Sequence, residues 1–250
     1  MAKAAALYSR LTILCQSTCV LTMIVVLAVL GPIGLMPAYG FPPYRSTDAE
    51  TADPWTVEAR LGLFRVEREA RHNAYSSPLL RVNFGLPGNL ELLSEFEYRP
   101  DEGQVADAAV GLKWIPLMQS LSIGVETLVL LPVSQKNEGA GVESVLLTTL
   151  RVGTLRLHIN AGGFYDARPS ESERGWKSSG LVEVQLDRFR PGVEVFAKQV
   201  RTQPVQVLVG PGIIFDMGPF DLRAGLHVGL TREAADLTPS VWVTSKFPVW

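Results

Sequence analysis

The chain has 250 residues, of which 47% are hydrophobic and 19% are charged, and its formal net charge is −2. This length allows a single all-β domain. The mean hydropathy of +0.17 is high for a soluble protein, yet the sequence lacks the repeated apolar 20-residue runs of a helical membrane protein. The sequence offers no basic face of the kind that nucleic-acid binding requires, so we expect no nucleic-acid partner.

The N-terminus has the pattern of an export signal. Lys3 and Arg10 form a basic start, an apolar run follows from Leu11, and Ala38-Tyr39-Gly40 places small residues where a signal peptidase cleaves. We expect residues 1–40 to be a signal peptide that directs export through the Sec pathway. Because the apolar run is long, an uncleaved anchor remains an alternative.

Both cysteines, Cys15 and Cys19, lie inside this signal. The mature protein would therefore have no thiol nucleophile, thiolate metal site or disulfide. Residues 41–54 are polar and rich in proline, which predicts a flexible leader before the folded domain at 55–250.

From Trp55 onward the sequence alternates between apolar and polar residues with a period of two, which is typical of half-buried strands. About twelve such segments can be marked: 55–63, 80–86, 90–99, 106–114, 121–131, 146–152, 155–163, 180–186, 193–199, 205–215, 220–230 and 241–247. Pro211 removes a backbone donor within one of them, so we expect a bulge or break near Gly210-Pro211-Gly212.

In these segments every charge falls on one side of the alternation and the other side is uncharged. This pattern predicts an antiparallel up-and-down transmembrane β-barrel of about twelve strands, with lipid against the uncharged side. Most strand glycines share the charged side, where they let a strand bend without crowding the lumen. The residues expected to line the lumen are Glu58, Arg60, Arg81, Glu91, Glu95, Glu97, Lys113, Glu126, Arg156, His158, Glu194, Lys198, Arg223 and His227.

The connections between the segments alternate between short and long, as in outer-membrane barrels, which have short periplasmic turns and longer outer loops. The long connections are expected at 64–79, 132–145 and 164–179. The C-terminal stretch Val241–Phe247 resembles the signal that the outer-membrane assembly machinery binds, although the chain ends three residues later, at Trp250. The expected surroundings are outer-membrane lipid and lipopolysaccharide.

Three stretches resemble a known family: Leu80–Leu92, Asp107–Trp114 and Leu121–Pro132. They are similar to the "MetA-pathway of phenol degradation" family of outer-membrane transporters, with Ala106 in place of a family glycine and Pro132-Val-Ser in place of Pro-Thr-Gly. The resemblance covers residues 55–150. It implies passage of small molecules, aromatic or otherwise hydrophobic ones among them, across the outer membrane.

No catalytic, metal or cofactor site is expected. His72 lies in a charged connection, while His158 and His227 share the charged side, and nothing in the sequence pairs either one with a serine. No metal motif occurs. Glu91, Glu95 and Glu97 face bases of neighbouring strands, which indicates either a charged constriction that selects solutes or cross-strand ion pairs that fill the lumen.

The leading interpretation is therefore an outer-membrane channel or transporter for small-molecule solutes, without enzymatic activity. Two alternatives remain open. One is a plugged structural or adhesive barrel that acts through its surface loops, and the other is a secreted soluble β-sandwich.

Overall fold

A computed structural model describes residues 43–68, 73–101, 103–133, 139–169 and 171–249, and these residues form strands and connections only. The expected signal peptide, residues 1–40, lies outside the described residues, as does His72. Within the described part of the chain, no helix is long and apolar enough to cross a membrane.

The strands follow one another around a single antiparallel sheet. Their bounds are β1 Thr56–Arg68, β2 Asn73–Ser76, β3 Leu79–Leu86, β4 Leu90–Arg99, β5 Gln104–Leu117, β6 Leu121–Leu130, β7 Gly141–Val152, β8 Leu155–Asp166, β9 Glu173–Val184, β10 Phe189–Val200, β11 Gln206–Asp216, β12 Phe220–Gly229 and β13 Leu237–Pro248. The short β2 pairs with the second half of β1, and β3 pairs with the first half. Together β2 and β3 occupy one position, so the sheet is a barrel of twelve strands.

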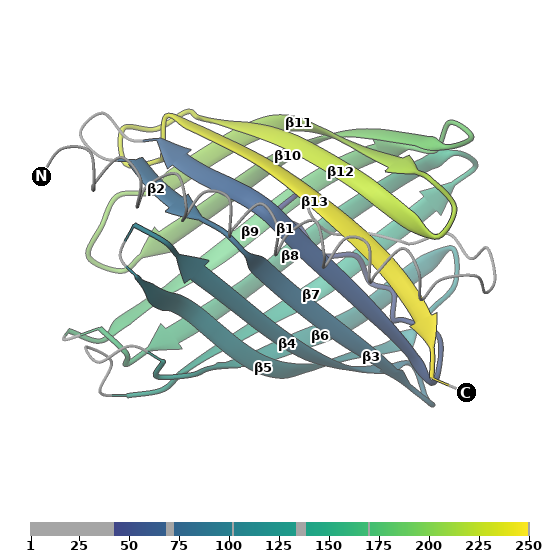
Figure 1. Ribbon diagram of the computed structural model, residues 1–250, viewed down its shortest axis with the longest axis horizontal. Helices are drawn as coiled ribbons and strands as arrows, with labels where there is room; N and C mark the ends of the chain where they lie inside the picture. Colours follow the sequence, from purple (N-terminus) through teal and green to yellow (C-terminus); the bar gives the residue numbers. More distant parts are fainter. Residues whose placement is uncertain (1–42, 69–72, 102, 134–138, 170, 250) are drawn as a thin grey trace, which may run out of the picture. The chain divides into compact units, whose positions relative to one another are not determined.

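The barrel closes where β1 pairs with β13, from Thr56 opposite Pro248 to Arg68 opposite Leu237 (Figure 1). Closure leaves no sheet edge with unpaired backbone groups, which a structure surrounded by lipid requires. Both β1 and β13 have an end at the rim formed by the turns 87–89, 118–120, 153–154, 185–188 and 217–219. We call this the short-turn rim.

Burial follows the predicted alternation. On the outer surface Leu146 is 56% exposed and Val193 is 55% exposed, whereas Lys113 and Glu194 on the inner surface are fully buried. Large apolar side chains that face outward and charged side chains that face inward invert the arrangement of a soluble protein. The exterior therefore suits lipid. This arrangement rules out the soluble β-sandwich.

The strands extend beyond the predicted segments, mostly toward the rim opposite the short turns. The connections there are 100–103, 131–140, 167–172, 201–205 and 230–236, and we call this the loop rim. The expected long connections are wrong in extent, because β1 and β2 occupy most of 64–79, β7 begins within 132–145, and β8 and β9 occupy much of 164–179. Polar residues on both faces hid these strand ends from the alternation. The adhesive-barrel alternative relied on these connections, and most of their residues belong to strands of the barrel wall.

Two details of register differ from expectation or add to it. No bulge forms at Gly210-Pro211-Gly212, because β11 keeps one register with β12 on both sides of Pro211. The expected break is local: the pairing with β12 skips Gly210 and Pro211, while β10 pairs with β11 through both residues. A bulge in β1 between Gly62 and Phe64 is new. A bulge shifts the alternation by one residue, and as a result Arg65 turns into the lumen.

Candidate functional site: the lumen of the barrel

The residues predicted to line the lumen all occupy inward-facing positions. Nine of them are buried: Glu58, Arg60, Glu91, Lys113, Glu126, His158, Glu194, Arg223 and His227. Arg81, Glu95, Glu97 and Arg156 are partly buried in ion pairs. The Lys198 amine lies 5.0 Å from the centre of the Phe164 ring.

Ion pairs line the half of the lumen that lies next to the short-turn rim. Arg60 Nε lies 2.6 Å from Glu58 Oε1, and Lys246 Nζ lies 3.3 Å from Glu58 Oε2. Arg223 pairs with Asp221 at 2.9 Å. Here the structure matches the ion-pairing alternative, because these groups are buried and compensate one another.

Farther from the short-turn rim, the ion pairs fit the alternative of a charged constriction better. Arg81 binds both Glu95 and Glu126, and Asn83 binds Glu91. Arg81, Glu95 and Glu126 lie beside open space, so solutes that enter the lumen meet both signs of charge, whereas Asn83 and Glu91 are buried.

The segment 43–54, which we call the luminal segment, runs inside the barrel. Its residues Tyr44, Ser46, Asp48, Ala49 and Ala52 are all at most 6% exposed. The expectation of a flexible leader is therefore wrong for these residues. Composition predicted a loop because the segment is polar and rich in proline, and it does lack regular structure; its partners come from distant strands, which composition does not report.

Side chains of five strands hold the backbone of the luminal segment. The Ser46 N–H donates to Glu194 on β10, and the Thr47 N–H donates to Asn160 Oδ1 on β8 at 2.7 Å. Asn160 Nδ2 returns a bond to the Thr47 carbonyl at 2.8 Å. Further bonds run from Ala49 N–H to Thr149 on β7, from Ala52 N–H to Glu91 on β4, and from Lys113 Nζ on β5 to the Glu50 carbonyl.

Charged side chains of the luminal segment are paired as well. The Glu50 carboxylate binds Arg151 and lies 3.6 Å from Arg156 Nη1. The Asp48 carboxylate lies 3.3 Å from Lys113 Nζ. Burial and the neighbouring Asp48 carboxylate raise the pKa of Glu50, against the lowering effect of the two arginines.

Two glycines that face each other across β11 and β12 make room for the start of the luminal segment. A Cβ atom on Gly212 would lie 2.6 Å from the Tyr44 ring, and one on Gly225 would lie 2.5 Å from Pro43 Cβ. Both distances are shorter than van der Waals contact allows, so only glycine fits while the segment is in place. The inward position of these glycines was visible in the sequence, but the reason for it was not.

His158 packs inside the lumen next to the luminal segment. His158 contacts Thr149 Oγ1 at 2.9 Å through Nδ1 and Glu183 Oε2 at 3.0 Å through Nε2. A hydroxyl, an imidazole and a carboxylate in line are the parts of a hydrolase triad. The Thr149 hydroxyl is completely buried and already accepts the Ala49 N–H, so no substrate reaches it with the segment in place.

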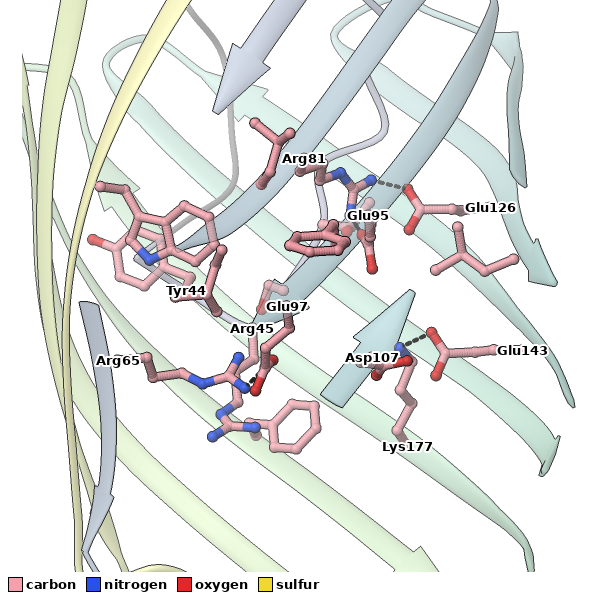
Figure 2. A pocket seen from close by; sticks show the side chains of 18 residues that line it. Tyr44, Arg45, Arg65, Arg81, Glu95, Glu97, Asp107, Glu126, Glu143 and Lys177 are labelled. Atoms are coloured by element: carbon pink, nitrogen blue, oxygen red, sulfur yellow. Dashed lines mark hydrogen bonds and ion pairs between the residues drawn. The ribbon is translucent and has the colours of Figure 1, made fainter. Parts of the chain in front are cut away.

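A cavity of about 280 Å³ lies on the other side of the luminal segment, toward the loop rim. Figure 2 shows its walls, where Arg65 faces Glu97, Lys177 faces Glu143, and Arg81 lies between Glu95 and Glu126. Tyr44, Arg45, Ser46 and Thr47 of the luminal segment line it too, and so do Phe196 and Trp242.

The sequence analysis did not predict that several of these cavity residues line the lumen. Arg65 lies past the β1 bulge, while Glu143 and Lys177 lie on strand ends that were expected to be loops. Trp242 stood on the inward side of the last segment, and that position was the available signal.

Comparisons with known proteins support the same architecture. No family model matches the chain, and no curated protein is similar to it in sequence. The NanC porin superposes with a TM-score of 0.57 at 11% identity, over 76% of this chain and 98% of the porin. The KdgM porin gives a TM-score of 0.56 at 12% identity, over 77% of this chain and 99% of the porin.

A third solved porin is more distant, with a TM-score of 0.43 at 10% identity, and this chain spans 62% of its length. At identities this low, the similarity to the NanC and KdgM porins shows the β-barrel fold alone. The apolar exterior of the barrel fits a position in a membrane.

Proposed function

We propose that the barrel is an outer-membrane channel or transporter that passes small molecules. The observation that carries this proposal is the cavity inside the lumen, bounded by charged side chains and enclosed by a wall with an apolar exterior. A volume of about 280 Å³ is close to the lower end of the roughly 300–1,000 Å³ range of small-molecule pockets. The porin fold supports the same role.

The lining of the cavity favours small aromatic solutes that carry a charged group. Tyr44, Phe196 and Trp242 offer aromatic faces, and Arg45 lies over the Phe196 ring at 5.4 Å from its centre. Aromatic solutes stack on such faces, and nearby charges of both signs hold an ionised group. The resemblance to the family of phenol-degradation transporters favours the same class of solute.

Solute entry into liposomes that contain the purified barrel tests this function. We expect an aromatic acid such as benzoate to enter faster than a non-aromatic acid of similar size, and we expect Trp242→Ala to reduce this difference. The matched control is Trp176→Ala, because Trp176 is on the outer surface and 41% exposed. The proposal is wrong if no solute enters faster than into empty liposomes, either with the wild type or with a variant whose luminal segment has been displaced.

A further inference from the structure

The luminal segment stands across the path that a solute has to take. It contacts β4, β5, β7, β8 and β10 through hydrogen bonds, and its first residues pack on Gly212 of β11 and Gly225 of β12. Between the cavity and the short-turn rim, the segment and the ion pairs described above occupy the lumen. The docked segment therefore narrows the path that a solute takes from the cavity to the short-turn rim.

The barrel does not need the luminal segment for its own backbone pairing. The wall closes through β1 and β13. The hydrogen bonds described above join the segment's backbone between Ser46 and Ala52 to barrel side chains, whereas the Asp53 carbonyl accepts from the backbone N–H of Thr56. Water replaces these polar contacts once the segment has left, because the barrel side chains that make them then face the water of the lumen. Removal of the segment therefore breaks no part of the strand ladder.

Few apolar contacts hold the segment. Its buried apolar side chains are Pro43, Tyr44, Ala49 and Ala52, and two of these four are alanines. An alanine side chain buries little apolar area, so the hydrophobic contribution that usually dominates a permanent core is small here.

The luminal segment is tethered at the short-turn rim. Asp53 and Trp55 are bound at the start of β1, where the Trp55 N–H donates to the Gly85 carbonyl at 2.8 Å. A segment tethered at this point leaves the lumen by swinging out through the short-turn rim. Cleavage after Gly40, as the sequence predicts, leaves the other end free to follow.

From these observations we propose that the luminal segment is a displaceable plug, which closes the channel when docked and opens it when it swings out through the short-turn rim. This inference rests on the proposed channel function. It explains why Gly212 and Gly225 face the lumen where the segment docks, and why its backbone binds side chains of the wall in place of strand partners.

A disulfide lock tests the proposal directly. An ideal Cβ on Gly225 lies 2.5 Å from Pro43 Cβ, and a disulfide needs a Cβ separation of about 3.5–4.5 Å, so a shift of roughly 1 Å permits the bridge. We place Pro43→Cys and Gly225→Cys in a background with Cys15→Ser and Cys19→Ser. Oxidised, the lock is expected to give no channel openings in planar bilayers. Reduction is expected to restore openings, at or above the level of the background protein, because the Cβ of an unbridged cysteine at position 225 crowds the docked segment.

A steric variant tests the opposite direction. Gly225→Val leaves no room for Pro43 and is expected to raise solute entry at least about tenfold, through a shift in the docking equilibrium. Trypsin cleavage after Arg45 reports whether the segment has left the lumen. Gly180→Ala is the matched control, because a Cβ there meets nothing within 4 Å, and neither readout should change.

A full-length variant in which residues 43–53 are replaced by glycine and serine covers the case in which Gly225→Val fails to fold. Heat-modifiability on a gel reports folding in each case. If the oxidised lock conducts as well as the Gly-Ser variant, the plug proposal is wrong and the channel function stands. If no folded variant conducts, including those that trypsin cuts at Arg45, both proposals are wrong.

Discussion

Lys113 illustrates how single buried charges organise the lumen. Its amine lies 3.3 Å from Asp48 and 3.9 Å from Glu91, and donates to the Glu50 carbonyl at 2.8 Å, while its side chain is 1% exposed. It therefore connects the barrel wall to the luminal segment. A charge so deeply buried is tolerable only because its partners compensate it.

Removal of this charge leaves Asp48 and Glu91 buried without their cation. We expect Lys113→Met to lower the free energy of unfolding by about 3–5 kcal/mol, the usual cost of breaking a buried pair. Urea unfolding in detergent micelles measures the change. The control is Arg188→Met in the exposed turn 185–188, for which we expect a change within about 0.5 kcal/mol. Equal stability of the two variants would contradict the role given to Lys113.

The pattern of charged and apolar residues in the sequence predicts which side chains face the lumen. The sequence predicted Lys113, Glu91 and Glu194 on the inner surface, because one side of each strand carries the charges. It did not predict their partners in the luminal segment, since a hydrogen bond between Ser46 and Glu194 joins residues 148 positions apart and leaves no local signal. Short-range periodicity reports which way a side chain points, but it does not report what the side chain meets.

At the scale of the strand, the bounds predicted from the alternation are accurate where lipid covers the outer face of the strand. Where lipid covers the outer face the alternation is strict, and β4 was predicted with its exact bounds, 90–99. Where strands extend beyond the apolar belt, the alternation is lost. The first residues of β9, Glu173-Arg-Gly-Trp-Lys, are mixed on both faces, so this part was expected to be a loop.

An arginine placed at two depths on the outer surface tests whether lipid covers the apolar side chains there. Leu146 lies in the middle of β7 and is 56% exposed on the outer surface. We expect Leu146→Arg to destabilise the barrel in liposomes by about 2–4 kcal/mol, the cost of arginine near the bilayer midplane. Urea titration of tryptophan fluorescence measures it.

The matched control is Leu230→Arg. Leu230 is 62% exposed and follows the end of β12 at the loop rim. Near an interface the same substitution costs only about 0–1 kcal/mol. Equal losses for the two variants would mean that lipid does not cover the middle of β7.

At the scale of the whole molecule, the barrel wall and the luminal segment have different roles. The wall supplies a rigid barrel that is complete in its backbone pairing, and the segment determines whether the lumen is continuous. The ion pairs near the short-turn rim and those around the cavity also differ in environment: the first are enclosed by protein, while the second face open space. Only the second group is in a position to select solutes, because a selecting charge has to meet the solute.

Ion selectivity follows from the charges around the cavity. Five carboxylates and four cationic side chains line it: Glu95, Glu97, Asp107, Glu126 and Glu143, with Arg45, Arg65, Arg81 and Lys177. Arg45 leaves with the luminal segment, so five carboxylates and three cationic side chains remain in the open state, and we expect a preference for cations. Glu143→Lys removes one carboxylate and adds a cation next to Lys177, which leaves four side chains of each sign and should abolish the preference.

The reversal potential under a KCl gradient, recorded in the Gly225→Val background, measures this change. Glu233→Lys is the control, because Glu233 lies exposed in the loop 230–236 and away from the cavity walls, where salt screens its charge. A shift of the reversal potential with Glu143→Lys but not with Glu233→Lys places the selecting charges at the cavity. An unchanged potential with Glu143→Lys would mean that ions take a route that avoids these walls.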